Sequence, residues 1–197
     1  TDCGNTPDGD FFFVMEYVDG TDLDRIIRRD GPMPLERTLM IGIQIARALE
    51  AAHRVGIIHR DLKPSNVMLV RAKDEADQVK VLDFGVAKFL RASSGDVELT
   101  QADSAVGTPR YMAPEQLGRS AEVDFRADIY ALGGVLYAML SGGKPPIEGD
   151  TLEELAHRKR SDLPRPIDAY RSDLPPRLES LIMRCLGRLP NERPASM

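Results

Sequence analysis

Apolar positions divide the chain into two long helices, several short elements and polar loops. The run over 11–18 is rich in aromatic and β-branched residues and ends at an Asp-Gly turn, so it predicts a strand of a larger sheet. A short helix is expected over 22–29, with Thr21 as its N-cap. The 35–54 segment keeps its polar residues on one narrow stripe, which predicts a long and mostly buried helix.

The second half of the pattern begins with two extended stretches, 67–70 and 79–82, which predict a hairpin carried on helices. The region 83–115 is polar and irregular, and such long loops in compact domains are usually functional or mobile. A second strongly apolar helix is expected over 125–140. Two further helices are expected near 152–158 and 177–186.

Composition places the chain among folded proteins with one core. It has 197 residues, 42% of them hydrophobic and 29% charged, which is ordinary for a globular domain. Its net charge of −5 argues against a general affinity for nucleic acid or for an anionic membrane. No apolar run approaches the ~20 residues that span a bilayer, so no membrane segment is expected in this part of the protein.

The two cysteines, Cys3 and Cys185, lie far apart in the sequence, so a disulfide framework is not expected. Cys185 continues an apolar stripe at helical spacing and is expected to be a buried thiol. The other members of the stripe are Leu178, Leu181, Ile182 and Leu186. Free thiols favour a reducing compartment, and we therefore expect a cytoplasmic location.

The segment with the clearest chemistry reads His-Arg-Asp-Leu-Lys-Pro-Ser-Asn over 59–66, between the long helix and the first short strand. It resembles the catalytic loop of protein kinases. Phosphoryl transfer needs a carboxylate, a cation near the transferred phosphate and oxygen ligands for Mg²⁺, and Asp61, Lys63 and Asn66 supply one of each. Any one of them alone would be read as a solvated loop residue. The resemblance, not the spacing, assigns their catalytic roles.

Asp83 and Phe84 begin an Asp-Phe-Gly motif directly after the second short strand. The resemblance implies that Asp83 binds the metal together with Asn66, and that Phe84 packs behind it. His59 is then expected to be a core residue packed against Phe84. The histidines show no spacing with cysteines or carboxylates that would suggest a zinc site.

Residues 107–115 read Gly-Thr-Pro-Arg-Tyr-Met-Ala-Pro-Glu and resemble the end of a kinase activation segment, which presents a surface to the substrate peptide. Thr108 together with Lys63 resembles the serine/threonine branch of the family. Arg60 is expected to bind a phosphate carried on the activation segment. The acceptor expected there is Thr100, with Ser104 as the alternative.

Two further matches concern structure rather than chemistry. Asp128 lies in a segment that resembles the helix whose buried Asp holds the catalytic-loop backbone. Arg193 lies where the family has an Arg that pairs with the glutamate at Glu115. Because buried charges need partners, both side chains are expected to be paired.

The first strand resembles the segment of a kinase that borders adenine. Met15 takes the place of the residue that guards the back of the nucleotide site, and the main chain of Glu16 and Val18 is expected to face the base. Asp22 matches the position that bonds the ribose hydroxyls, and Met68 would form the floor beneath the adenine ring. An ordinary core strand is the alternative interpretation.

Together these motifs identify the chain with the eukaryotic-like (Hanks-type) protein serine/threonine kinases, in a form that resembles the bacterial members. The implied fold is α+β, a protein-kinase-like C-lobe that is mainly α-helical with short β-hairpins. Residues 1–18 would supply the last N-lobe strand and the hinge, and 19–197 the C-lobe. The Gly-rich loop, strand Lys and helix Glu of an intact kinase cannot be placed in this sequence. A fragment that works with an upstream N-lobe is therefore expected. Because bacterial members of the family often have membrane parts elsewhere in the chain, any membrane tether is expected outside this fragment.

The resemblance implies ATP and Mg²⁺, or Mn²⁺, as cofactors and a protein with Ser or Thr hydroxyls as substrate. A small-molecule phosphotransferase of kinase-like fold is one alternative, and residues 107–115 argue against it. A pseudokinase that serves as an interaction module is another. It would be expected to have lost Asp61, Asn66 or Asp83, and all three are present.

Overall fold

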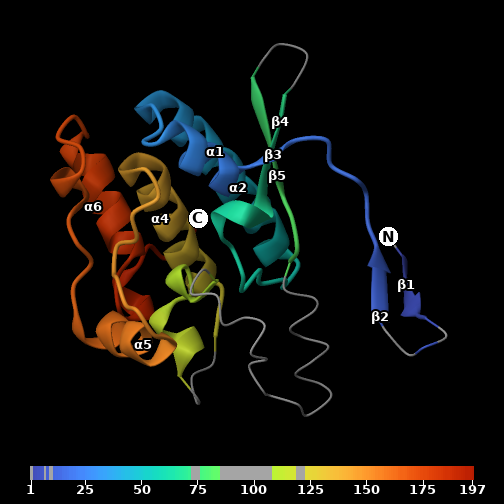
Figure 1. Ribbon diagram of the computed structural model, residues 1–197. Helices are drawn as coiled ribbons and strands as arrows, with labels where there is room; N and C mark the ends of the chain where they lie inside the picture. Colours follow the sequence, from blue (N-terminus) through green and yellow to red (C-terminus); the bar gives the residue numbers. More distant parts are fainter. Residues whose placement is uncertain (1, 7, 9–10, 72–75, 85–107, 119–122) are drawn as a thin grey trace.

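A computed structural model describes residues 2–6, 8, 11–71, 76–84, 108–118 and 123–197 of the chain (Figure 1). The α-helices are α1 (Leu23–Asp30), α2 (Leu35–Arg54), α4 (Arg126–Ser141), α5 (Leu152–Ser161) and α6 (Pro176–Cys185). Short 3₁₀ turns are η1 (Pro64–Asn66), η3 (Thr108–Arg110), η4 (Pro114–Leu117), η5 (Ile167–Ala169) and η6 (Pro190–Glu192). The predicted fold class, mainly helical with short β-hairpins, is confirmed.

The strands form two small antiparallel sheets. One pairs β1 (Asp2–Asn5) with β2 (Phe11–Val14), and the other has the order β3 (Thr21–Asp22), β4 (Val67–Arg71), β5 (Asp77–Val81). Figure 1 shows the β1–β2 hairpin standing apart from the helical body at the end of an extended segment. The strand predicted over 11–18 is shorter than expected, because its ladder with β1 ends at the pair Asp2–Val14.

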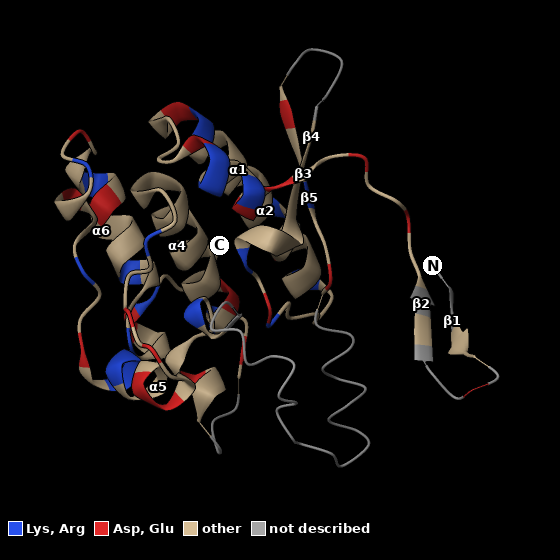
Figure 2. Cartoon of the chain, viewed as in Figure 1, with Lys and Arg blue, Asp and Glu red and all other residues tan. Residues whose placement is uncertain are grey.

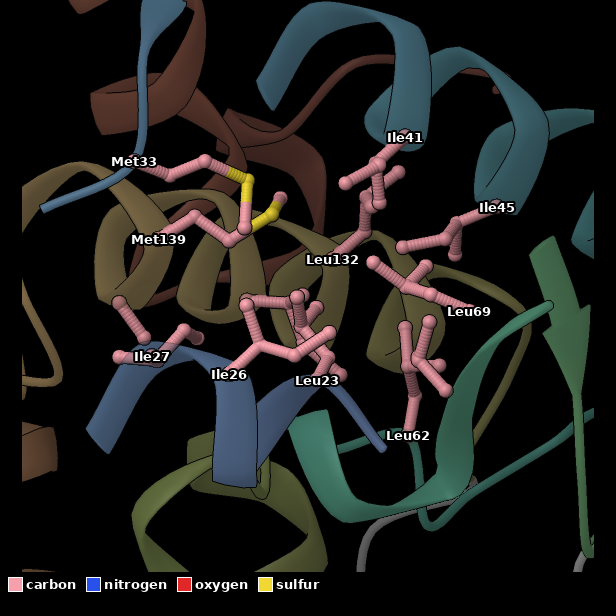
Figure 3. Close-up of a cluster of buried hydrophobic side chains, with 14 of the residues drawn as sticks. Leu23, Ile26, Ile27, Met33, Ile41, Ile45, Leu62, Leu69, Leu132 and Met139 are labelled. Carbon is pink, nitrogen blue, oxygen red and sulfur yellow. The ribbon is translucent and has the colours of Figure 1, made fainter. Parts of the chain in front are cut away.

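Helix α4 is the centre of the packing. Its residues are apolar on nearly every side, which is typical of a helix with neighbours all round, and almost all of them are buried. One face packs against α1, α2 and β4, and Figure 3 shows Leu132 and Met139 of α4 among the side chains of this cluster. The opposite face packs against α6 and η5 through a second cluster. Packing against α4 therefore fixes the positions of the elements that contain the candidate site residues.

Helix α1 starts one residue later than predicted, and its N-cap is Asp22 instead of Thr21. The carboxylate of Asp22 accepts a hydrogen bond from the main-chain nitrogen of Arg25 at 2.9 Å. Thr21 is paired with Leu69 in the β3–β4 ladder, so its backbone is committed to the sheet. Asp22 pairs with Met68 in the same ladder, so both residues could act as caps, and the hydrogen bond from Arg25 identifies Asp22.

Helix α2 has the predicted bounds, but it is less buried than predicted. Leu39, Met40 and Ile43 are 37%, 59% and 48% exposed. The helix packs on α4 and β5 through the face that carries Ile41 and Ile45, and the other apolar positions lie outside that contact. Apolar residues are not always buried, and the polar stripe alone does not show which apolar positions of the helix meet a neighbour.

Helix α6 follows the predicted apolar stripe with one exception. Ile182, Cys185 and Leu186 are buried, whereas Leu181 is 44% exposed. Burial raises the pKa of the Cys185 thiol to about 11, which agrees with a buried free cysteine. Within the described part of the chain, no helix combines the length and apolar character needed to cross a membrane.

Candidate active site

The loop that follows α2 is anchored by one buried carboxylate. Asp128 of α4 is fully buried, and its oxygens accept hydrogen bonds from the main-chain nitrogens of His59, at 2.8 Å, and Arg60, at 2.9 Å. The ring nitrogen Nε2 of His53, at the end of α2, lies 2.7 Å from the same carboxylate. Three polar partners thus compensate the burial of the carboxylate. The backbone directly before Asp61 is fixed to the core.

Two non-glycine residues of the site have left-handed backbone conformations. Arg60 has φ 63° and Asp83 has φ 56°. Such conformations are unfavourable for L-residues and persist where the surroundings hold them. Arg60 is held on both sides, since its nitrogen donates to Asp128 and its carbonyl oxygen accepts from Nε2 of Gln116 at 2.7 Å. The strained positions lie beside Asp61 and at Asp83, the two predicted acidic site residues.

The structure gathers the three predicted catalytic-loop side chains in one turn. Lys63 Nζ lies 3.2 Å from Asp61 Oδ2, and the two side chains are only 22% and 18% exposed. Asn66 donates from Nδ2 to the main-chain oxygen of Asp61 at 2.9 Å. Because the amide nitrogen faces Asp61, the amide oxygen of Asn66 is the atom that could bind a cation.

The catalytic loop and the strand end that carries Asp83 are bonded to each other through the main chain of Leu82. Leu82 donates to the carbonyl oxygen of Asn66 at 2.8 Å, and His59 Nε2 lies 2.9 Å from the carbonyl oxygen of Leu82. The other ring nitrogen of His59 accepts from the backbone nitrogen of Asp61 at 3.3 Å, so the ring carries its proton on Nε2.

His59 also fixes the residue after Asp83. Its ring is fully buried and lies 4.7 Å from the ring of Phe84, between centroids. Burial lowers the pKa of His59, against the opposing influence of Asp128. The neutral ring is therefore favoured, as its hydrogen bonds require. His59 and Phe84 together form the packed support behind Asp83.

Asn66 supplies an amide oxygen and Asp83 an exposed carboxylate. The hydrogen bond from Leu82 to the carbonyl oxygen of Asn66 connects the two loops that carry them. Hard oxygen ligands suit Mg²⁺, which usually keeps waters and takes only one or two protein carboxylates. No group of three or more His, Cys, Asp or Glu residues suited to a metal occurs among the described residues. The donor set therefore fits a metal shared with phosphate oxygens, and it does not fit a closed all-protein metal cage.

Some residues predicted to contact the nucleotide are also brought together. Asp22 pairs directly with Met68 in the β3–β4 ladder. Asp22 is already engaged as the N-cap of α1, and its second oxygen lies 3.2 Å from Arg25 Nε. Val18 is half-buried, and the main-chain role expected of Val18 and Glu16 stays a prediction.

The segment predicted to be the hinge contacts the β3–β4–β5 sheet through an ion pair. The carboxylate of Glu16 accepts a hydrogen bond from Lys80 Nζ of β5 at 2.7 Å, and this contact lowers the pKa of Glu16. Met15 next to it is 56% exposed. A residue that guards the back of a closed nucleotide site would be covered, so that role stays a prediction for Met15.

A buried ion pair holds the segment predicted to face the substrate against the helical body. Arg193 is 0% exposed at its side chain and forms a bidentate pair with Glu115 at 2.6 and 2.8 Å. Thr108 begins η3 at the other end of this segment. Thr100 and Ser104, the predicted phosphate acceptors, lie outside the described residues.

Sequence reasoning missed three residues that are hydrogen-bonded to the predicted site segments or to Asp128. They are His53 on Asp128, Gln116 on the carbonyl oxygen of Arg60, and the buried Lys159 of α5, which bonds the substrate-facing segment. Gln116 also accepts from the backbone nitrogen of Ala113 at 2.8 Å, so its amide bridges two loops. A glutamine two positions after a proline carries no such signal in sequence.

Fold and site together define a kinase-like class of protein. The structure is similar to the crystal structure of the PknI kinase domain of Mycobacterium tuberculosis, with a TM-score of 0.71 and 28% sequence identity. The similarity covers 99% of this chain and 65% of that chain.

The family follows from the sequence comparison. The family model described as "Protein kinase domain" matches residues 4–197, and the chain belongs to the protein kinase family. It is 42% identical over 197 residues to serine/threonine-protein kinase pkn3 of Myxococcus xanthus, which covers 99% of this chain and 36% of that protein. It is 40% identical over 189 residues to PknB of Mycolicibacterium smegmatis, which covers 95% of this chain and 29% of that protein. The chain thus spans about a third of the length of these relatives.

Proposed function

We propose that this chain is the helical lobe of a Mg-ATP-dependent protein serine/threonine kinase. The observation that carries the proposal is the turn in which Asp61, Lys63 and Asn66 contact one another, on a backbone held by Asp128. Family membership and the serine/threonine kinases among the relatives support it. Residues 19–197 correspond to the C-lobe, and 1–18 to the last N-lobe strand and the hinge. A cytoplasmic location for this part of the protein belongs to the same proposal.

Each residue of the turn has a distinct task in this proposal. Asp61 accepts the proton of the acceptor hydroxyl and orients that oxygen. Lys63, which lies 3.2 Å from Asp61, supplies a positive charge beside the reacting group. Asn66 and Asp83 would hold Mg²⁺, or Mn²⁺ in its place, and Mg-ATP supplies the phosphoryl group.

On the nucleotide side, the main chain of Glu16 and Val18 would bind adenine, Asp22 the ribose and Met68 the apolar floor. Asp22 and Met68 are already neighbours in the β3–β4 ladder, which supports a shared contact. An intact kinase binds the phosphates of ATP with a Gly-rich loop and a Lys. In this proposal the upstream part of the same protein would supply these groups.

The test is an acceptor assay on the full-length gene product that carries these residues. Transfer from γ-³²P-ATP is measured with Mg²⁺ to myelin basic protein and, separately, to a panel of small alcohols and aminoglycosides. We expect label on Ser or Thr of the protein acceptor and none on the small molecules. Label on small molecules alone, or nucleotide binding without any transfer, would overturn the proposal in favour of a small-molecule phosphotransferase or an interaction module.

A further inference from the structure

Helix α5 buries a lysine, Lys159, that is not one of the predicted catalytic, nucleotide or metal residues. Lys159 is 1% exposed although it stands in a basic run, and its neighbours His157, Arg158 and Arg160 are exposed. None of the ion pairs among the described residues includes Lys159. Burial of a lysine is unfavourable unless its N–H groups find partners, so this position calls for a specific reason.

The partners of Lys159 are two main-chain oxygens of the substrate-facing segment. Its Nζ donates to the carbonyl oxygen of Arg110 at 2.8 Å and to that of Met112 at 2.6 Å. Figure 1 shows α5 beside the yellow-green stretch that contains η3 and η4. Hydrogen bonds from an ammonium group are stronger than bonds between neutral groups. The lysine therefore fixes the path of the backbone between η3 and η4.

The same backbone leads from Lys159 to the catalytic loop. Directly after Met112, the nitrogen of Ala113 donates to Gln116, and Gln116 donates to the carbonyl oxygen of Arg60. Arg60 immediately precedes Asp61. A continuous series of hydrogen bonds thus connects α5, the substrate-facing segment and the residue before the proposed base.

A second contact joins Lys159 to the ion pair at the other end of the segment. Its Nζ lies 5.0 Å from the ring centroid of Tyr130, and the guanidinium of Arg193 lies 5.0 Å from the same ring. Arg193 pairs with Glu115. Two cations that share one aromatic ring hold the segment at Arg110, Met112 and Glu115, and cation–ring contacts are strengthened by burial.

The cluster carries one positive charge more than it can neutralise. Burial, together with the nearby charge of Arg193, lowers the pKa of Lys159 to about 7, against the opposing influence of Glu115. A neutral amine keeps two N–H groups and can still reach both carbonyl oxygens, but without the added strength of the charge. The hydrogen bonds from Lys159 to the carbonyl oxygens of Arg110 and Met112 therefore weaken when Lys159 loses its proton.

We propose that Lys159 is a positioning residue for the acceptor: it fixes the backbone over 110–112 and so sets the surface that receives the substrate protein. Lys159 itself touches no reacting atom. The proposal rests on the proposed kinase function, and it predicts an effect on acceptor binding that is separate from nucleotide binding. Of the proposed nucleotide-side residues, Asp22 lies on β3 and Met68 on β4, and Glu16 and Val18 precede β3. Among the described residues, no hydrogen bond joins any of these four to α5.

The test compares the full-length gene product with Lys159→Met and with Lys144→Met, an exposed lysine outside the cluster, as the matched control. The side chain of methionine has nearly the same length but no N–H donors. We expect KM for myelin basic protein to rise about tenfold in Lys159→Met, the loss expected for charge-assisted hydrogen bonds. KM for ATP stays within about twofold, and Lys144→Met leaves both constants unchanged. Hydrogen–deuterium exchange over 108–117 should increase in Lys159→Met alone.

Two further measurements do not depend on the folding of that variant. Lys159→Arg keeps the charge and the donors and is expected to retain much of the affinity for the acceptor. In the wild type, KM for the acceptor should rise several-fold between pH 6 and pH 8, and Lys159→Met should lack this rise. An unchanged acceptor KM in a folded Lys159→Met, or a wild-type KM independent of pH, would overturn the proposal. Absence of any transfer by the wild type would instead contradict the kinase function on which the proposal rests.

Discussion

Single buried charges fix the geometry of this site at the scale of the residue. Asp128 holds the loop before Asp61, and Arg193 holds the end of the segment predicted to face the substrate. Arg193 also donates to the carbonyl oxygens of Gly187, Arg126 and Arg188. A buried charge satisfied in this way does not have to be strongly stabilising, but removal of one partner leaves the other without compensation.

Replacement of Arg193 by methionine should lower the free energy of unfolding by about 3 kcal/mol, because Glu115 would remain buried and unpaired. The control is Arg29→Met. The pair Arg29–Asp30 has the same 2.6 Å separation as Arg193–Glu115, but Arg29 is 70% exposed. Chemical denaturation of both variants measures the difference. A loss in Arg29→Met as large as that in Arg193→Met would show that burial does not set the strength of these pairs.

Lys159 predicts a stability that depends on pH in a stated direction. Its pKa is lowered from the ordinary 10.5 to about 7 in the folded protein, so between these values the unfolded chain binds the extra proton. Stability therefore increases as the pH rises through this window, by about 1.4 kcal/mol per unit at most. Between pH 7 and pH 9 the wild type should gain about 2 kcal/mol relative to Lys159→Met. Equal pH slopes for the two proteins would contradict the burial of a titrating ammonium.

Sequence reasoning found the residues that the family motifs mark, and it missed those whose role depends on tertiary placement. Asp61, Lys63, Asn66 and Asp83 stand in motifs with fixed neighbours. Lys159 lies in a run of basic residues that reads as a solvated face, and nothing in that run shows which side chain turns inward. The direction is decided by the position of α5 against η3 and η4, which is a property of the fold.

At the scale of the element, α4 determines how the other helices approach. Gly133 lies where α6 crosses α4, and a Cβ at this position would come 2.7 Å from the Cβ of Cys185. The neighbouring Gly134 faces only Tyr111, whose Cδ1 would be 3.3 Å from the added atom. Both glycines are in a helix, where alanine is intrinsically favoured by about 1 kcal/mol. Only the first is required for close packing.

Gly133→Ala should therefore destabilise the protein by about 1 kcal/mol, because overpacking against Cys185 outweighs the gain in helix propensity. Gly134→Ala should be neutral or slightly stabilising. The melting temperatures of the two variants, recorded by circular dichroism, separate the effects. Identical shifts in both variants would mean that the crossing of α4 and α6 does not depend on the missing side chain.

The elements themselves were largely predictable. Helix α2 has the bounds that its polar stripe predicts, and the β4–β5 hairpin lies where two extended stretches flank a polar loop. The degree of burial was not predictable, since Met40 and Leu181 are apolar and exposed. Periodicity shows which residues share a face, but not which faces meet a neighbour.

At the scale of the whole molecule, the β1–β2 hairpin and the predicted hinge extend from one side of the helical body (Figure 1). Figure 2 shows Lys and Arg interspersed with Asp and Glu along the described helices. In the proposed function, recognition of the acceptor would rely on the local shape of the 108–115 segment more than on long-range charge. In the same proposal, catalysis depends on the turn that contains Asp61.

The most direct test of the account is the rate of phosphotransfer by Asp61→Asn in the full-length gene product, beside nucleotide affinity measured on the same samples. Asparagine has the same shape but cannot accept the proton of the acceptor hydroxyl. The rate should fall about 10²–10⁴-fold while the Kd for Mg-ATP stays within about threefold, because Asp61 serves the acceptor and not the nucleotide. Asp168→Asn, at an exposed carboxylate of η5, should change neither quantity. Activity of Asp61→Asn within a few-fold of the wild type would contradict the account.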